Sequence, residues 1–421
     1  MRKRVEIGEL KLGMYICELD CQWPDSPFDT RGFALKSIDQ IKLLARHCRF
    51  VFVETDLEAP ESALVTPERS KSASFTHVER PELELEILKN YVSPGSNNGN
   101  YVDLVAVEEE IDTIRDTHKQ AVALIDNMMQ QLRQGKNLNT VATHEVVSAL
   151  THSIVRNPDA LVCFTKMKET HVSMAQHGLR CCILALALGR HLGMGQQQLY
   201  DLGIGALLHD IGKTSVPIEI LECGHELSEE EIQLYRKHVP AGIIILENTK
   251  GIPEESIGLV CLHHEHYDGN GYLHSLSGNQ ISQFGHIGGI VNFFDGLTHP
   301  RPGRRQVSAH IALKMIYEQR GRMFHPHLAE EFIRCMGIYP IGSIVEMRSG
   351  EIGVVVALNR TRRLKPRVAI VHDPAAPAAS TVSTVNLADH RNQRGEALEI
   401  ANVLDENVCD FDPSNYLPVV A

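Results

Sequence analysis

The sequence predicts a mainly α protein, a helical bundle with a small β-rich module before it and a small β appendage after it. Apolar residues recur at helical spacing through most of residues 104–340. Residues 1–60 and 341–373 instead show short apolar runs and alternation around turn residues, the pattern of strands. These two observations divide the chain into an N-terminal module, a helical region and a C-terminal appendage.

Composition limits the kinds of partner. The chain has 421 residues, of which 43% are hydrophobic, enough to bury the cores of more than one domain. Its formal charge of −12 and scattered basic residues argue against a nucleic-acid polymer or an anionic membrane, whereas a small phosphorylated ligand is compatible. Ten cysteines without paired spacing suggest a reducing compartment, and four of them lie among apolar neighbours and are predicted to be small core residues: Cys17, Cys163, Cys181 and Cys182. No apolar run reaches the roughly 18 residues of a membrane span, so we expect a cytoplasmic protein.

The N-terminal module, residues 1–60, is predicted to be β-rich with one short helix. Its strand candidates are Val5–Leu10, Met14–Leu19 and Phe50–Glu54. The segment Ser37–Leu44 begins with a capping residue and continues at helical spacing. Trp23 stands in a proline-bounded loop, where closing a small core is favoured over ligand binding. Residues 61–103, with several prolines and a polar run, are predicted to be a linker.

Two connecting helices are predicted within residues 104–157. The first runs from about Val105 to Gln134 and the second from Val141 to Val155. In the first helix, apolar or weakly polar residues recur every seven positions, and a second set fills the intervening core positions: Ile111, His118, Ile125 and Leu132, then Ile114, Ala121 and Met128. The repeat predicts helix pairing, within the chain or in a homodimer. An ordinary amphipathic helix on the domain surface is the alternative.

Histidines and one aspartate mark the chemistry of residues 158–340. They lie on or at the ends of separate predicted helices: His177, His209-Asp210, His238 and His263-His264. An imidazole and a carboxylate side by side offer a nitrogen and an oxygen ligand to one divalent ion. Alone, His177 would be read as a core histidine; the repeated pattern indicates a metal site. Lys213 would project beside it and could hold a phosphate oxygen.

A glycine-bearing turn follows the last histidines. The run from His263 to Tyr272 ends an apolar helix and contains Asp268, Gly269 and Gly271. Consecutive histidines cannot share one helix face, so His263 and His264 would serve two ions or two sides of one site. Beyond the helices, strands are predicted at Ser343–Met347, Gly353–Leu358 and Arg367–Val371. Residues 374–421 are predicted to be a flexible acidic tail.

The ordered motifs resemble the HD-GYP family, a bacterial subgroup of the HD-domain metal phosphohydrolases. The resemblance covers residues 158–340 and rests on the histidine and aspartate series, Gly212-Lys213, and Asp268-Gly269 with Gly271-Tyr272. It implies an HD-type helical bundle. Residues 1 to about 135 are similar to the N-terminal domain that often precedes HD-GYP domains, with Leu12-Gly13-Met14-Tyr15 and Trp23 as recognisable stretches.

The resemblance implies metal-dependent hydrolysis of cyclic di-GMP to pGpG or GMP. Two divalent ions are expected, iron or manganese, with zinc or nickel as alternatives. The implied metal ligands are His177, His209, Asp210, His238, His263 and His264, with Asn292 as a weak ligand. Asp210, which would bridge the ions, and Lys213 are the implied catalytic residues. The implied substrate-binding residues are Lys213, Asp268, Gly269, Gly271, Tyr272, Arg301 and Arg304.

Three positions depart from the family pattern. Asn292 stands where the family has an aspartate ligand, and Ser173 where three-metal members have a glutamate. Leu273 replaces the proline of the signature tripeptide. The alternative function is therefore a degenerate, catalytically weak cyclic di-GMP receptor or a module that binds a protein such as a diguanylate cyclase. A nucleoside triphosphohydrolase is a third alternative, which the Gly269–Tyr272 turn disfavours.

Overall fold

The computed structural model describes most of residues 101–418 and several short N-terminal stretches. The described ranges are 2–6, 10, 14–19, 33–35, 44, 50–54 and 101–418, the last with gaps at 139, 168–173, 224, 226, 301–305, 373–381, 392–396, 405–408 and 410. The chain divides into two compact units, Met1–Ser74 and Phe75–Ala421. Each unit is described by itself.

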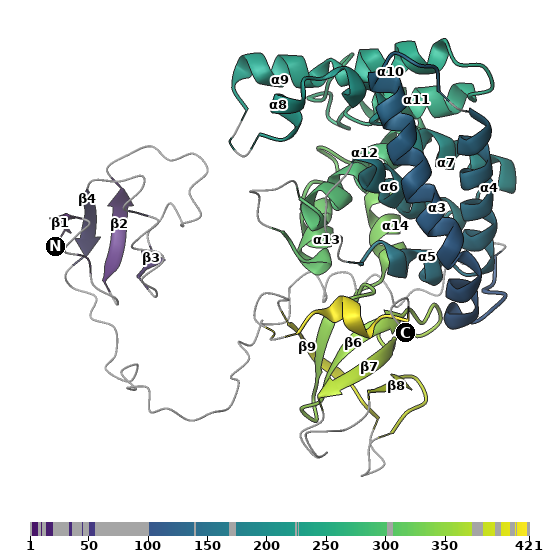
Figure 1. Ribbon diagram of the computed structural model, residues 1–421. Helices are drawn as coiled ribbons and strands as arrows, with labels where there is room; N and C mark the ends of the chain where they lie inside the picture. Colours follow the sequence, from purple (N-terminus) through teal and green to yellow (C-terminus); the bar gives the residue numbers. More distant parts are fainter. Residues whose placement is uncertain are drawn as a thin grey trace. The chain divides into compact units, whose positions relative to one another are not determined.

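The first unit contains a small antiparallel sheet. Its strands are β1 (Arg2–Glu6), β2 (Tyr15–Leu19), β3 (Phe33–Ala34) and β4 (Phe50–Glu54), in the order β1-β4-β2-β3 (Figure 1). Alternate residues such as Val5, Ile16, Val51 and Val53 are buried together, which confirms the predicted β-rich module. The predicted helix, except Leu44, and the loop around Trp23 lie outside the described residues.

The second unit is a helical bundle, as predicted. Its helices are α3 (Val107–Arg133), α4 (Thr140–Arg156), α5 (Pro158–Phe164), α6 (Met174–His191), α7 (Gln196–Leu208), α8 (Ile218–Leu221), α9 (Glu229–Arg236), α10 (His238–Glu247), α11 (Glu254–Leu262), α12 (Gln283–Thr298), α13 (Ala309–Glu318) and α14 (Pro326–Met336). Short 3-10 turns η3 (Ile211–Ser215) and η4 (Gly278–Gln280) interrupt them. Among the described helices, none is both long and apolar enough to cross a membrane.

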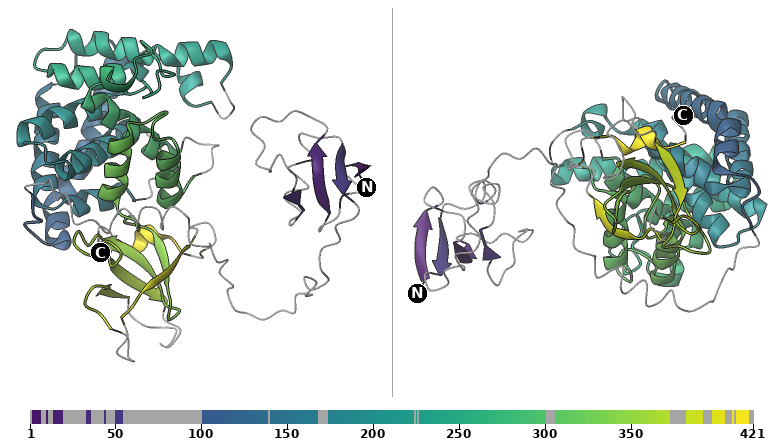
Figure 2. Two further views of the ribbon diagram at one scale, coloured as in Figure 1. Left: turned by 180° about the vertical axis from the view of Figure 1, so that it is seen from behind. Right: turned by 90° about the horizontal axis from the view of Figure 1, so that it is seen from below.

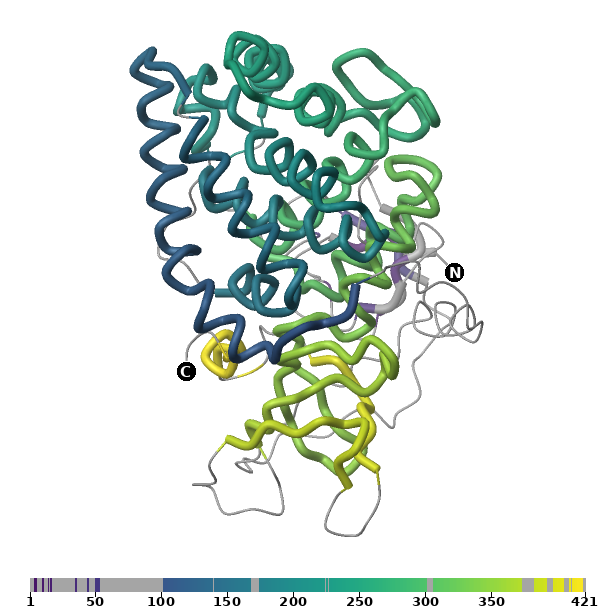
Figure 3. Tube along the Cα trace, turned by 90° about the vertical axis from the view of Figure 1, so that its right-hand side faces the viewer, coloured from purple at the N-terminus to yellow at the C-terminus, as the bar shows by residue number. Residues whose placement is uncertain are grey.

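The long helix α3 packs inside the chain. Its predicted seam residues Ile111, His118 and Ile125 are buried, and the helix contacts α4, α5 and α6 (Figure 3). The seam residues therefore pack within the chain. Of the two kinds of helix pairing that the heptad pattern allows, the structure shows the pairing within the chain. The predicted connecting helices α3 and α4 share one hydrophobic core with the later helices.

Helices α6 and α7 occupy the centre of this core. Every residue of α6 from Gly178 to Arg190 is buried, because this stretch is largely apolar on all sides. Helix α7 packs against α6 and α11, α12 packs against α6 and α11, and α10 packs against η3. This packing brings the C-terminal ends of α7 and α11 and the start of α10 to one place.

A five-stranded antiparallel sheet covers one end of the helices (Figures 1 and 2). Its strands are β5 (Ile344–Met347), β6 (Ile352–Ala357), β7 (Arg367–His372), β8 (Ser383–Asn386) and β9 (Ile400–Leu404), in the order β8-β7-β6-β5-β9. Val354 and Val356 join the helical core, whereas Val355 packs on the opposite face. The predicted β appendage is present and larger than expected.

The prediction of a flexible tail after residue 373 is wrong for its described part. Strands β8 and β9 form the two edges of the sheet, and η6 (Pro413–Tyr416) packs beside β6. Strand β8 was missed because it is short and polar and gains its order from backbone pairing with β7. The predicted linker also ends earlier than residue 103, because the hydroxyl of Tyr101 donates to the Met194 carbonyl and Asp103 pairs with Arg190.

Candidate metal centre

Five helices bring the predicted metal ligands to one place. His177 lies in the first turns of α6, His209 caps α7, His238 begins α10, His263 and His264 follow α11, and Asn292 lies in α12. The helix ends meet because Gly212, in the turn after Asp210, touches the backbone of α10. A Cβ atom at Gly212 would lie 1.9 Å from the carbonyl oxygen of His238, so only glycine fits there.

Asp210 is the centre of the cluster. Its Oδ2 atom lies 3.4 Å from Nε2 of His177 and 3.5 Å from Nε2 of His209. Its Oδ1 atom lies 3.4 Å from Nε2 of His238 and 3.8 Å from Nε2 of His263. Each carboxylate oxygen therefore faces a different pair of histidines, the arrangement that a bridging carboxylate requires.

Backbone carbonyls fix the orientation of three of these rings. The Nδ1–H groups of His209, His238 and His263 donate to the carbonyls of Ala206, Tyr235 and Val260 at 2.8, 2.7 and 2.8 Å. Because a carbonyl only accepts, Nδ1 carries the proton in each neutral ring and Nε2 carries the lone pair. The three lone pairs are thus held ready for a positive charge near Asp210.

The donor atoms of the cluster fit metal ions, because they are buried and several have no hydrogen-bond partner among the described residues. His209, Asp210, His238 and His263 are each at most 2% exposed. Within the described part of the chain, Nε2 of His209, His263 and His264 and Oδ1 of Asp210 have no hydrogen-bond partner. Buried polar atoms without partners are costly unless something satisfies them. Donor atoms of Asp210, His238, His263 and His264 lie within 4.8 Å of one another, so one ion can satisfy them together.

The charges in the cluster favour neutral rings at His209, His263 and His264 around an ionised carboxylate. Burial lowers the pKa of His209 to about 4, and burial also holds the pKa values of His263 and His264 well below the usual range. Burial opposes ionisation of Asp210, but Lys213 and the surrounding histidines hold its pKa well below its usual range. The Lys213 ammonium donates a hydrogen bond to Oδ2 of Asp210. Neutral imidazoles and a carboxylate are the ligand states that metals require.

His177 is held from the α12 side. Its Nδ1 atom lies 2.7 Å from Oδ2 of Asp295, and its Nε2 atom lies 3.0 Å from Oδ1 of Asn292. Asp295 is fully buried and accepts two further hydrogen bonds from Arg180, at 2.7 and 3.1 Å. Burial opposes a charge on His177, but Cys181, Asp210 and Asp295 raise its pKa well above the usual value. Asp295 thus orients His177.

The turn that follows the last histidines packs Tyr272 onto the cluster. The ring of Tyr272 stacks on His264 with centroids 4.6 Å apart, and the Arg236 guanidinium lies over the Tyr272 ring with Cζ 4.7 Å from its centroid. An added Cβ at Gly271 would lie 2.3 Å from the backbone nitrogen of His266. The buried carboxylate of Glu265 accepts backbone hydrogen bonds from the returning chain at 2.6 and 3.0 Å. This loop is therefore built on close backbone packing.

Asp268 and Gly269 shape the same turn. Gly269 has a φ of +82°, which favours glycine. Asp268 accepts hydrogen bonds from the backbone and the side chain of Asn270 at 3.0 and 2.9 Å. Contact of this turn with a substrate stays a prediction. Arg301, Arg304 and Ser173 lie outside the described residues.

Sequence reasoning missed several residues that touch the cluster. Cys181 was interpreted as a small core residue, yet its Sγ lies 3.8 Å from Nδ1 of His177. Its position one helical turn after His177 was the available signal. Arg180 and the aromatic ring of Tyr235, which lies 5.3 Å from Nζ of Lys213, carried no recognisable pattern.

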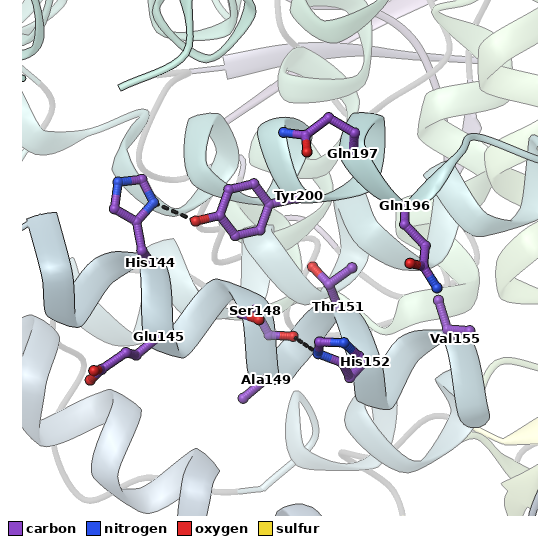
Figure 4. A pocket seen from close by; sticks show the side chains of 10 residues that line it. All are labelled: His144, Glu145, Ser148, Ala149, Thr151, His152, Val155, Gln196, Gln197 and Tyr200. Atoms are coloured by element: carbon purple, nitrogen blue, oxygen red, sulfur yellow. Dashed lines mark hydrogen bonds between the residues drawn. The ribbon is translucent and has the colours of Figure 1, made fainter. Parts of the chain in front are cut away.

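A separate cavity of about 760 Å³ lies between α4 and α7 (Figure 4). Its lining includes His144, Ser148, Thr151, His152, Gln197 and Tyr200. The Tyr200 hydroxyl lies 2.5 Å from Nδ1 of His144. The lining residues that the structure describes include none of the predicted site residues, so this cavity is distinct from the histidine cluster.

Comparisons with known proteins agree with this geometry. Residues 161–328 match the family model of the HD domain, and residues 2–143 match that of a domain of unknown function (DUF3391). A cyclic di-GMP phosphodiesterase of Pseudomonas aeruginosa is 30% identical over 374 residues, which cover 88% of this chain and 85% of that protein. Fold and cluster thus define an HD-domain protein. More narrowly, the chain belongs to the HD-GYP family.

Two further relatives match a smaller part of the chain. The cyclic di-GMP phosphodiesterase response regulator RpfG of Xanthomonas campestris pv. campestris is 30% identical over 148 residues, 35% of this chain and 39% of that protein. The 3'3'-cGAMP-specific phosphodiesterase 2 of Vibrio cholerae is 30% identical over 167 residues, 39% of this chain and 31% of that protein. Related proteins are thus named for two different cyclic dinucleotides.

Proposed function

We propose that this protein hydrolyses cyclic di-GMP to pGpG or GMP with divalent metal ions held around Asp210. The observation that carries the proposal is the convergence of four histidine Nε2 atoms on the two oxygens of the Asp210 carboxylate, at 3.4 to 3.8 Å. The relatives' names supply the substrate class.

The ligand set divides into two groups that share Asp210. His177, His209 and the weak ligand Asn292 would hold one ion through the Oδ2 side, and His238, His263 and His264 would hold the other through the Oδ1 side. Imidazole and carboxylate donors suit iron, manganese, zinc or nickel better than magnesium or calcium. When bound, such ions supply charge stabilisation for the phosphodiester and a water molecule of lowered pKa.

The chain's own residues position the substrate. Lys213, buried beside Asp210, would place its ammonium against a non-bridging oxygen of the scissile phosphate and neutralise its charge. Tyr272 offers a ring near the cluster that is already stacked on His264. Arg301, Arg304 and the Asp268, Gly269 and Gly271 turn are the remaining proposed substrate contacts.

Turnover by reconstituted protein tests the proposal. The full chain, reduced and loaded with manganese or iron, should convert cyclic di-GMP to a linear product, with 3'3'-cGAMP assayed in parallel. An Asp210→Ala variant should lose this activity, and a His152→Ala variant, altered on the exposed surface of α4, should keep it. Absence of turnover by wild-type protein that has bound its metal would refute the enzymatic proposal.

A receptor for cyclic dinucleotides is the second candidate, and Asn292 favours it. The amide provides a neutral oxygen where the family pattern has a charged ligand, which weakens one metal position. Under this alternative the wild type binds cyclic di-GMP without hydrolysis, and Asn292→Asp gains activity. Cytoplasmic location, a homodimer and a diguanylate cyclase partner stay predictions.

A further inference from the structure

Cys181 lies inside the histidine cluster. It follows His177 by one turn of α6 and is fully buried. Its Sγ atom is 3.8 Å from Nδ1 and 3.9 Å from Nε2 of His177. One ligand atom from each of Cys181, His177 and His209 lies within 4.8 Å of the other two. Three donors at this spacing can reach one ion after small side-chain movements, since metal–sulfur and metal–nitrogen bonds are about 2.3 and 2.0 Å long.

A second observation points to a ligand at the same place. Nε2 of His209 is buried and has no hydrogen-bond partner among the described residues. The ring cannot turn this nitrogen elsewhere without breaking the bond from Nδ1–H to Ala206. A buried lone pair therefore lies beside the Cys181 sulfur, with nothing in the described protein to satisfy it.

The charge balance of the site favours a bond between the Cys181 sulfur and the ion on the His177 side. On the His177 side, Asp210 is the charged donor among the proposed ligands, because Asn292 is neutral. Two positive charges of an ion held there would be balanced by at most one negative charge, which the second ion shares, and a thiolate would supply another. A sulfur ligand also makes a metal site softer than nitrogen and oxygen ligands alone would make it. A softer site favours zinc, iron(II) or cobalt(II) over magnesium.

We propose that Cys181 is a thiolate ligand of the ion held by His177 and His209, replacing the charge that Asn292 does not supply. This inference rests on the metal site of the proposed function. When the metal–sulfur bond forms, the thiol proton leaves to solvent, and no oxidation takes place. The hydrogen-bond contact from Sγ to the Val291 carbonyl, at 3.8 Å, is long and weak, so little is lost on binding.

Cobalt(II) spectroscopy tests the proposal without measuring activity. The full chain, depleted of metal and reconstituted with cobalt(II) without oxygen, should show a sulfur-to-cobalt charge-transfer band in the near ultraviolet. Cys181→Ser should remove the band and weaken binding of the cobalt held by His177 and His209 at least about tenfold, a loss of about 1.4 kcal/mol. Cys182→Ser is the matched control, because Cys182 is the next residue, equally buried, and outside the cluster. It should keep both the band and the affinity.

The outcomes separate this inference from the proposed function. Two outcomes would contradict the thiolate ligand: cobalt bound at the cluster without a sulfur band, or a band unchanged in Cys181→Ser. Neither outcome would contradict a metal site formed by the histidines. Wild-type protein that binds no more cobalt than Asp210→Ala would instead refute the metal site itself. If Cys181→Ser does not fold, X-ray absorption of cobalt-loaded wild type decides, with sulfur expected at about 2.3 Å and its absence contradicting the proposal.

Discussion

Nε2 of His177 lies 3.0 Å from Oδ1 of Asn292. This contact links α6 and α12 across the cluster and places a neutral amide beside a proposed metal ligand. Because Asp295 holds Nδ1 of the same ring at 2.7 Å, the ring is fixed between the two α12 side chains. The identity of residue 292 therefore sets the charge of one half of the site.

Asn292→Asp should bind divalent metal more tightly. The new carboxylate would add a negative charge close to His177, and a gain of about 1.4 kcal/mol would appear as roughly tenfold higher affinity. Competition with a chromophoric chelator measures the manganese affinity of both proteins, and Asn292→Ala, which has no side-chain oxygen, should bind more weakly than wild type. Equal affinity in all three would show that residue 292 does not face an ion.

Asp210 and Lys213 should be coupled in stability. Asp210→Asn leaves the buried ammonium without its carboxylate, and a cost of about 3 kcal/mol is expected. Adding Lys213→Met should recover part of that loss, so the double-mutant cycle should give a coupling of about 1–3 kcal/mol. Urea unfolding in the presence of a chelator measures this coupling in the metal-free protein. Additive effects of the two substitutions would contradict the ion pair.

Gly271 should be required for packing. Gly271→Ala places a Cβ 2.3 Å from the His266 backbone nitrogen, so the turn carrying Tyr272 must move away from His264. The melting temperature should fall by several degrees, as for a loss of 1 to 2 kcal/mol. Gly258→Ala in α11, where an added Cβ meets nothing within 4 Å, is the control and should be neutral or slightly stabilising. A stable Gly271→Ala variant would rule out this packing role.

His118 should make the protein sensitive to acid. Burial lowers the pKa of this ring to about 4 from an ordinary value of 6.5. The unfolded chain therefore binds the proton more readily, and stability falls as the pH drops from 6.5 towards 4. At pH 5 the shifted pKa of His118 lowers the free energy of unfolding by about 2 kcal/mol relative to pH 7. His118→Leu should lack this component, which chemical unfolding of both proteins at the two pH values would reveal as a smaller decrease.

Sequence patterns predicted the helices and the order of the site because both are local properties. The apolar run that ends at Leu208 and Gly212 two residues after Asp210 determine where His209 stands, and in the structure α7 ends at Leu208 with His209 as its C-cap. The pairing of Arg180 with Asp295 joins residues 115 positions apart, and no local pattern predicts it. Cys181 was read as core because a buried cysteine beside a metal ligand has the same neighbours in sequence as any core cysteine.

The metal content of the purified protein tests the central claim most directly. Wild-type protein, reconstituted under reducing conditions and freed of excess ions, should hold two divalent ions per chain by elemental mass spectrometry. Asp210→Ala should hold fewer, because the carboxylate that faces both histidine groups is gone. Equal and negligible metal in the two proteins would contradict a metal centre at Asp210 and with it the proposed hydrolysis.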